Sequence, residues 1–517
     1  MKSGAVARSV LSGTLSNYAS VFVRMGLGVV TFRLLYQGLS KEEFGFWSLL
    51  WSVFGYGVLL DFGFGYAAQK RVAELSVKKN WDSLGRVLSS IVFFYFASAA
   101  ILVLVASFFS GQLVGFLGVS VENREVFRGS LFLFVLGMGF AFPLGIFPEV
   151  LRGQQRLWVA NLISMGGMIA NFIGVCAVLW FKLGFNVLIG FSLACVLIPD
   201  AVAMILALRH MPGVKLSWRL FSMAQVRETS RFSLYAYLNM LSNILRNKTD
   251  QLVVGSVLSV GAVAPYQAGG KVGEMFHLLT RQISEALSPA AAHLHASGDR
   301  EALRRMLVSG MRWSVMAATP LYIVSALYLT GLVRLLTGEV TPSMETVWVG
   351  HLLLFWYWSL VVTHLVFKRM FMMAGQERRM MWQGVTEALT NLALSVFLTW
   401  HLGSIMGVAI GSVIPTFLFG WGVLWPWAAV EAGLTRFALF RRVVLGSVAG
   451  CVPMLIVGLL LRYQSFWASG STTLLVLVEG GSVFAVGLAG LWTFSLDATE
   501  RAQVLEKVLK RSPRQGA

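Results

Sequence analysis

The chain of 517 residues is 56% hydrophobic and only 13% charged, and its formal net charge is +18. Soluble domains carry charged residues at about 25% of positions, so this composition excludes a soluble protein and indicates one embedded in a membrane. The positive charge matches membrane topology and attraction to anionic lipid, and we expect no nucleic-acid partner.

Apolar stretches of about 20 residues, long enough to cross a bilayer, recur along the whole chain. They predict an all-α polytopic membrane protein with about 14 transmembrane helices. The predicted helices cover residues 15–36, 44–68, 88–110, 127–150, 157–181, 185–208, 232–258, 263–292, 310–336, 346–371, 380–401, 403–428, 440–462 and 472–494. The first stretch lacks a convincing small-residue cleavage site, so we expect it to remain as a membrane helix.

Basic residues set the expected orientation of these helices. Most of the 42 Lys and Arg residues fall in the tails and in every second connection, including the 209–231 linker and the 495–517 tail. Because cytoplasmic segments carry an excess of Lys and Arg, we expect both termini and the 209–231 linker to be cytoplasmic.

An internal repeat is visible in the first 430 residues. Leu39-Ser40 aligns with Leu258-Ser259, and at the same offset Asp82 aligns with Glu301. The repeat predicts two parallel six-helix lobes, which support alternating access around a central site. The predicted lobes cover residues 1–208 and 232–428, and an additional two-helix hairpin covers residues 440–494.

Two predicted helices carry charges where a lipid-facing helix should have none. Each charged side chain at mid-membrane costs about 2.5–3.5 kcal/mol, so such residues face a wet cavity or one another. At helical spacing the charges of helix 263–292 fall in one sector, which predicts the wall of a polar chamber. The charges are Arg246, Lys248 and Asp250 on helix 232–258, and Lys271, Glu274, His277, Arg281 and Glu285 on helix 263–292.

The candidate binding residues follow from this geometry. Basic residues slightly outnumber acids in the helices that would line the chamber, which favours an anionic cargo, and Arg in particular suits phosphate. We therefore predict a cationic cavity that binds substrate through Arg24, Arg246, Lys271 and Arg281. The buried acids are candidates either for coupling to H⁺ or Na⁺ or for structural pairing: Asp61, Asp250, Glu274, Glu285 and Glu387. In particular, Arg246 and Asp250 could form an ion pair within their helix, because they lie four residues apart.

The sequence offers no sign of an enzyme or a cofactor. It contains no phosphate-binding glycine loop with Lys-Ser/Thr and no His-Glu-x-x-His motif, and the three cysteines have no metal-ligand spacing. We predict a protein that is not an enzyme and that has no catalytic residue, metal or cofactor.

Several segments resemble the bacterial O-antigen-type oligosaccharide flippases of the multidrug/oligosaccharidyl-lipid/polysaccharide exporter superfamily. The similarity covers residues of about 10–430, and no single motif in it is specific alone. The segments are Leu39-Ser40-Lys41-Glu42-Glu43-Phe44-Gly45-Phe46-Trp47, Asp61-Phe62-Gly63, Gly153-Gln154-Gln155-Arg156, and Asp250-Gln251 followed by Ala264-Pro265-Tyr266-Gln267-Ala268.

The resemblance implies a function and a location. It implies flipping of a polyprenyl-pyrophosphate-linked oligosaccharide from the cytoplasmic to the outer leaflet of the bacterial inner membrane, for cell-surface polysaccharide assembly. The implied partners are the lipid-linked glycan, membrane lipids and glycan-assembly proteins. Two alternatives stay open: a multidrug/cation antiporter of the same fold, and a membrane glycan polymerase or ligase.

Overall fold

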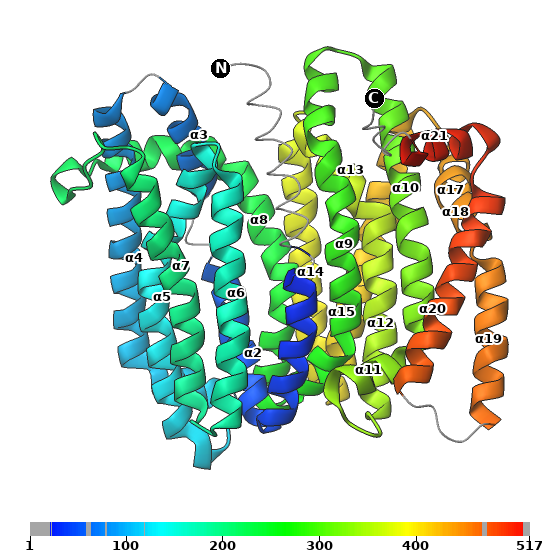
Figure 1. The fold of residues 1–517 in the computed structure, drawn as a ribbon, viewed down its shortest axis with the longest axis horizontal. Helices are drawn as coiled ribbons and strands as arrows, with labels where there is room; N and C mark the ends of the chain where they lie inside the picture. The colour runs from blue at the N-terminus through cyan, green and yellow to red at the C-terminus, as the bar shows by residue number, and fades with distance from the viewer. Residues whose placement is uncertain are drawn as a thin grey trace, which may run out of the picture. The chain divides into compact units, whose positions relative to one another are not determined.

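The computed structural model describes residues 21–57 apart from residue 22, 64–77, 80–117, 119–467 and 473–509. In these residues the structure is built from helices joined by short connections and contains no β-strand (Figure 1), which confirms the predicted all-α fold class. Residues 23–38 form the first described helix. The labelled α-helices are α2 (Lys41–Gly57), α3 (Phe64–Val77), α4 (Trp81–Phe116), α5 (Arg124–Gly153), α6 (Leu157–Trp180), α7 (Phe185–Arg209), α8 (Met223–Val257), α9 (Val263–Ala296), α10 (Arg300–Leu327), α11 (Leu329–Thr337), α12 (Met344–Leu360), α13 (Val366–Met373), α14 (Glu377–Leu402), α15 (Met406–Phe419), α16 (Trp425–Ala432), α17 (Arg436–Phe440), α18 (Gly446–Ala449), α19 (Val452–Trp467), α20 (Thr473–Gly490) and α21 (Ala498–Leu509).

The helices identify a multi-pass membrane protein. Seven of the described helical segments are long and apolar enough to cross a bilayer, and two bent helix pairs raise that number to nine. Helices α8 and α9, with 35 and 34 residues, are long enough to span but carry the charges noted above. The larger total of about 14 stays a prediction.

Two predicted helices are bent in the structure. The segment expected at 310–336 consists of α10 and α11, which meet at 79°, and the segment expected at 440–462 contains a bend of 40° after α18. Hydropathy runs unbroken across both bends, and it reports burial in lipid but not the direction of the chain. A third difference is that α8 begins at Met223, inside the predicted 209–231 linker, because its first turns are helical without being apolar.

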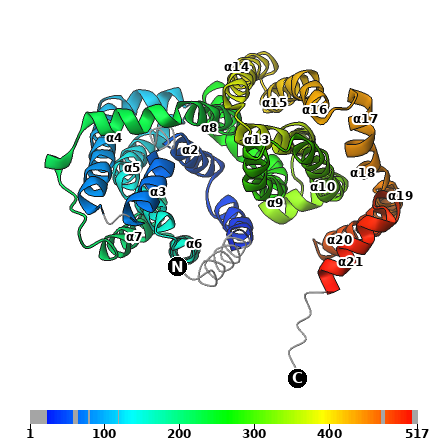
Figure 2. The ribbon, with the colours of Figure 1, turned by 90° about the horizontal axis from the view of Figure 1, so that it is seen from above.

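By its contacts the chain divides into two compact units. Unit 1 contains residues 1–267, 336–338 and 384–408, and unit 2 contains the remainder. The core of unit 1 is formed where α3 to α7 pack together. The core of unit 2 is formed mainly by α9, α10, α13 and α16, with the π-helical segments 361–365, 420–424 and 441–445; Figure 2 shows the helices from above. The predicted lobes 1–208 and 232–428, and the hairpin 440–494, stay predictions.

The repeated segments begin their helices in the same way. The Ser40 hydroxyl accepts a hydrogen bond from the N–H three residues later, and Ser259 does the same at the aligned position. Asn80 caps α4 through the Ser83 N–H at 3.2 Å, and the aligned Asp299 caps α10 through the Ala302 N–H at 2.9 Å. Each side chain satisfies a backbone donor that a helix start leaves open.

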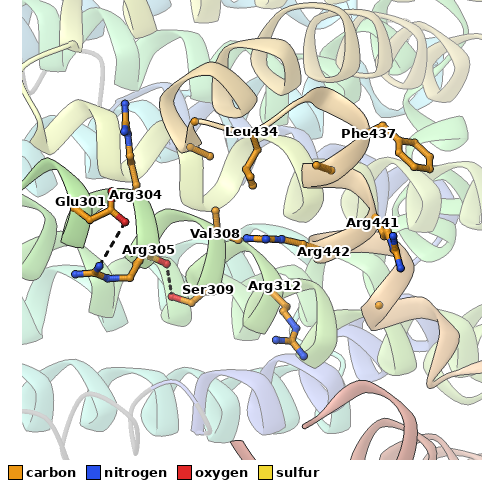
Figure 3. Close-up of a pocket in the computed structure, with 14 residues that line it drawn as sticks. Glu301, Arg304, Arg305, Val308, Ser309, Arg312, Leu434, Phe437, Arg441 and Arg442 are labelled. Carbon is orange, nitrogen blue, oxygen red and sulfur yellow. Dashed lines mark hydrogen bonds and ion pairs between the residues drawn. The ribbon is translucent and has the colours of Figure 1, made fainter.

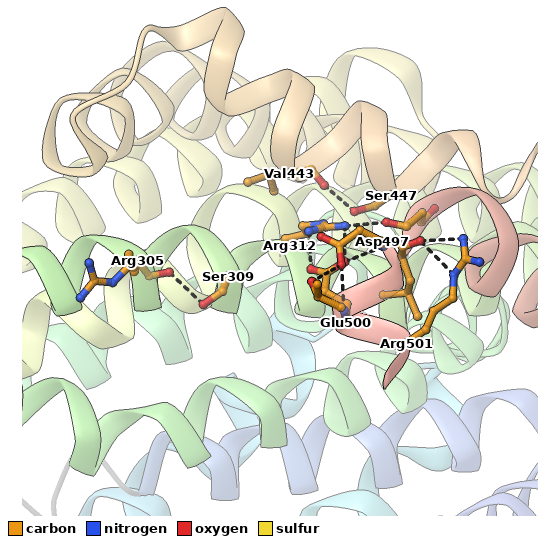
Figure 4. Close-up of polar contacts among 11 residues, drawn as sticks. Arg305, Ser309, Arg312, Val443, Ser447, Asp497, Glu500 and Arg501 are labelled. Atoms are coloured by element: carbon orange, nitrogen blue, oxygen red, sulfur yellow. Dashed lines mark hydrogen bonds and ion pairs between the residues drawn. The ribbon is translucent and has the colours of Figure 1, made fainter. Parts of the chain in front are cut away.

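The C-terminal helix α21 is fastened to α10 by a network that Figure 4 shows. Arg312 donates to both carboxylate oxygens of Glu500, at 2.6 and 3.0 Å, and Arg501 donates to the backbone carbonyls of Thr493 and Leu496, which follow α20. Asp497 precedes α21 and accepts hydrogen bonds from the Thr499 hydroxyl and the Glu500 N–H. These bonds lower the pKa of Asp497, so this cap is complete above the ordinary carboxylate range and is lost as the pH falls through the lowered pKa.

A close approach of backbones in unit 1 makes Gly45 of α2 a sensitive position. A Cβ atom there would lie 1.9 Å from the carbonyl oxygen of Val260. We expect Gly45→Ala to lower the free energy of unfolding by about 1–3 kcal/mol, the usual cost of overpacking. In the control Gly129→Ala a Cβ meets no atom within 4 Å, so helix propensity should raise stability slightly. Thermal unfolding in detergent would contradict this account if Gly45→Ala melted at or above the temperature of Gly129→Ala.

Candidate functional site

In unit 1 a buried polar cluster joins α8 to α14. Arg246 is 8% exposed and Glu387 is 0% exposed, and their Nη1 and Oε1 atoms lie 3.3 Å apart. Two buried ions of opposite sign stabilise one another only when both are present, since either alone keeps its desolvation cost. The structure therefore connects a predicted substrate-binding Arg with a predicted structural or coupling acid.

Asp250 belongs to the same region of unit 1. It is 5% exposed and accepts a hydrogen bond of 2.7 Å from the hydroxyl of Tyr266, which stands near the start of α9. The sequence predicts an ion pair between Arg246 and Asp250 as one possibility, and the structure adds Glu387 and Tyr266 as their respective partners. This cluster needs three helices, α8, α9 and α14, and sequence spacing within one helix cannot reveal it.

Glu387 stands in a polar row on α14. Gln383, Glu387 and Asn391 are spaced four residues apart, so they share one face of the helix. All three are buried, with exposed fractions of 7%, 0% and 1%. An acid in an apolar helix is costly unless it meets a cation, and Arg246 supplies that cation.

In unit 2 the charged side chains of the α9 stripe are more exposed than those of the polar cluster in unit 1. Lys271 Nζ lies 2.8 Å from Glu274 Oε2, and their side chains are 24% and 46% exposed. His277 follows on the same sector, with its ring 5.1 Å from that of Tyr357, and Arg281 is exposed. The stripe is therefore partly exposed, and its role as the wall of a polar chamber stays a prediction.

Two glycines of α9 mark the side of the helix that packs against α12 in unit 2. A Cβ on Gly269 would lie 2.6 Å from the Thr346 carbonyl oxygen, and one on Gly273 would lie 2.6 Å from the Tyr357 ring. Small residues bring α9 close to α12 on one side, so the long charged side chains occupy the other.

The remaining predicted site residues are placed as follows. Arg24 is exposed on helix 23–38. Glu285 lies in α9, but its side chain is outside the described residues, and Asp61 is outside them altogether. The roles assigned to all nine candidate residues stay predictions.

Sequence reasoning missed a buried basic pair in unit 2. His364 and Lys368 are 3% and 8% exposed, and His364 Nδ1 lies 2.7 Å from the Thr363 hydroxyl. They stand at and after a π-helical segment, Val361–Leu365, and such segments often mark functional positions. Gly420 opens a second π-helical segment, Gly420–Leu424, and its Cβ would lie 2.6 Å from the Thr363 hydroxyl. The spacing of His364 and Lys368 by one helical turn in an apolar run was the available signal.

Comparisons with known proteins agree with this architecture. Among curated proteins, one named "Putative O-antigen transporter" from Salmonella typhi is 23% identical over 301 residues, covering 56% of this chain and 67% of that protein. Its counterpart in Salmonella typhimurium is 23% identical over 310 residues, again 56% of this chain and 67% of that protein.

Solved structures share the fold. The lipid II flippase MurJ in an inward closed conformation superimposes with a TM-score of 0.69 at 14% identity, covering 96% of this chain and 99% of that one. An inward-facing MATE family multidrug resistance transporter superimposes with a TM-score of 0.67 at 14% identity, covering 81% and 96%.

The family model described as polysaccharide biosynthesis protein matches residues 34–345, which is more than half of the chain and includes α2 to α11. The chain therefore belongs to the polysaccharide biosynthesis protein family.

Proposed function

We propose that this protein is a flippase that moves a polyprenyl-pyrophosphate-linked oligosaccharide from the cytoplasmic to the outer leaflet, for cell-surface polysaccharide assembly. Its family, the O-antigen transporter name of its curated relatives and its lipid II flippase fold support this function. The observation that carries it is the ionic stripe of the membrane-length helix α9, because a phosphate-bearing head group needs such a surface inside a membrane.

The mechanism that fits these parts is alternating access. The sugar and pyrophosphate would enter a cationic cavity from the cytoplasm, while the polyprenyl tail stays in the bilayer. Lys271 and Arg281 would meet the phosphates, and Arg246 would contribute from the cluster held by Glu387. Helices and their connections supply binding and motion, and the proposal needs no enzyme chemistry and no cofactor other than a coupling ion, H⁺ or Na⁺.

The second candidate is a multidrug or cation antiporter, which the similarity to a MATE transporter fold favours. The two differ in the sign of the cargo: an antiporter binds organic cations and needs acids facing them. Across the predicted cavity helices, basic residues slightly outnumber acids, and Arg suits phosphate, so we favour an anionic cargo.

The identity of co-purified lipid tests the proposed function. Protein isolated from its native membrane in mild detergent should carry a polyprenyl-pyrophosphate glycan, which mass spectrometry detects by its mass and its fragmentation to sugar units. A preparation in which lipid II-like or other polyprenyl species are absent and a cationic drug binds tightly would overturn the proposal in favour of the antiporter.

The proposed orientation, with both termini cytoplasmic in the inner membrane, has its own test. Single cysteines at Lys41→Cys and Met344→Cys should react from outside with an impermeant maleimide, because both positions are exposed and lie on the predicted outer side. Trp218→Cys, at a position 69% exposed, should react only after the membrane is opened. The background variant should lack Cys176, Cys195 and Cys451. Labelling of Trp218→Cys from outside would contradict the proposed topology.

A further inference from the structure

Unit 2 contains a second basic site, apart from the stripe on α9. A cavity of about 1020 Å³ opens between the first turns of α10 and the segment from the end of α16 to η7, a π-helical stretch at Arg441–Leu445 (Figure 3). We call it the arginine pocket. Its lining contains one carboxylate, Glu301, against five guanidinium groups: Arg304, Arg305, Arg312, Arg441 and Arg442.

Three of these arginines are engaged by the protein. Arg312 is held by Glu500 of α21, Arg305 lies 3.4 Å from Glu301 on the surface, and Arg304 donates to the Glu431 carbonyl oxygen at 3.2 Å. Figure 3 shows the contact of Arg305 with Glu301, and Figure 4 shows that of Arg312 with Glu500.

The other two arginines, Arg441 and Arg442, have no such partner. Neither forms an ion pair or a side-chain hydrogen bond with any residue in the described parts of the chain. They are consecutive and exposed, at the point where α17 passes into η7. Both residues line the cavity, and guanidinium groups suit an anion because their planar forks match phosphate oxygens.

The position of the pocket identifies the source of that phosphate. Its walls belong to the ends of two membrane-spanning segments, the bent pair that begins at Arg300 and the bent pair that begins at Arg436. The end of a span lies at the level of lipid head groups, and the excess of basic residues places this end on the cytoplasmic side. Phe437 lines the same pocket and is 71% exposed. An exposed apolar group beside the basic ones suits an acyl chain better than a soluble anion.

We propose that the arginine pocket binds the phosphodiester head group of an anionic phospholipid of the cytoplasmic leaflet, with Arg441 and Arg442 as the main donors and Phe437 against an acyl chain. Basic pockets between transmembrane helices on this side of a membrane are known to hold anionic head groups. The site goes beyond the proposed transport of a glycan, since its residues are separate from the stripe on α9. Because Arg312 lines the pocket and also fastens α21, a bound lipid would lie beside the contact that holds the C-terminal helix.

Binding of short-chain lipids to the purified full chain tests this site. The probes are dioctanoyl phosphatidylglycerol, dioctanoyl phosphatidylcholine and inorganic phosphate, measured by native mass spectrometry in detergent. The unaltered protein should retain phosphatidylglycerol in preference to phosphatidylcholine. The double variant Arg441→Gln, Arg442→Gln should weaken phosphatidylglycerol binding by about tenfold or more, because each charge-assisted bond is worth roughly a factor of ten.

A matched control removes the same charge elsewhere. Arg300→Gln, Arg378→Gln loses two exposed arginines that do not line the pocket, so it should bind as the unaltered protein does. The variant Arg441→Lys, Arg442→Lys keeps the charge but not the fork and should be intermediate, which guards against a misfolded Gln variant. The proposal would be overturned if the control lost as much phosphatidylglycerol binding as the Gln variant, or if phosphatidylcholine bound as well as phosphatidylglycerol. It would also be overturned, in favour of a free-phosphate site, if equimolar inorganic phosphate displaced phosphatidylglycerol.

Discussion

Glu387→Ala is expected to lower the free energy of unfolding by about 3–5 kcal/mol, because it leaves Arg246 buried without the carboxylate that lies 3.3 Å from it. Arg246→Ala should cost a similar amount, since Glu387 is fully buried and Asp250 is nearby on the same helix face. Chemical or thermal unfolding of the purified variants in detergent measures the loss.

A paired substitution separates the structural role of this ion pair from its role in transport. Arg246→Met, Glu387→Met replaces both ions by apolar groups, and such exchanges are often neutral for stability. We expect the double variant to fold nearly as well as the unaltered protein and yet to transport poorly, because the cation is missing. A double variant that is stable and transports at the normal rate would show that the pair is only structural.

Charge reversal on the α9 stripe is expected to abolish transport without unfolding the protein. Lys271→Glu and Arg281→Glu each place a repelling carboxylate where the pyrophosphate should bind, and Ala at either position should reduce transport by about tenfold or more. Stability should change little, because Lys271 is 24% exposed at its side chain and Arg281 is exposed. The readout is the rate of lipid-linked glycan flipping at fixed protein content.

Two comparisons make that experiment specific to the stripe. Arg378→Ala removes an exposed arginine at the start of α14, outside the stripe, and should leave the rate unchanged. Arg281→Lys should retain part of the rate, because it keeps the charge but loses the bidentate fork. If Arg378→Ala slowed flipping as much as Lys271→Ala does, the loss would reflect overall charge and not a binding site.

The sequence alone predicted the fold class, because membrane helices are recognised by the length and hydropathy of their apolar stretches. The absence of any strand in the described residues follows from the composition. The repeat aligned Ser40 with Ser259, and the structure adds that both cap the start of a helical segment. The 79° bend after Leu327 could not be predicted, because hydropathy carries no information about the direction of a helix axis.

The candidate site was only partly predictable, for a related reason. The stripe on α9 follows from helical spacing alone, and the contact between Lys271 and Glu274 lies within one helix. The pairing of Arg246 with Glu387 joins residues of two helices far apart in the chain, so no local pattern could choose Glu387 over Asp250. The arginine pocket likewise needs α10 and η7 side by side, although its basic residues are plain in the sequence.

Flipping by the purified protein in liposomes is the most direct test of the central claim, that this chain carries a lipid-linked oligosaccharide across the bilayer on the basic residues of the α9 stripe. The assay places a fluorescent polyprenyl-pyrophosphate oligosaccharide in both leaflets and follows its accessibility to a glycan-cleaving enzyme added outside. The account predicts that the unaltered protein makes the inner pool accessible and that the double variant Lys271→Ala, Arg281→Ala, reconstituted to the same level, does not. Equal accessibility with both proteins, or none beyond protein-free liposomes with either, would contradict it.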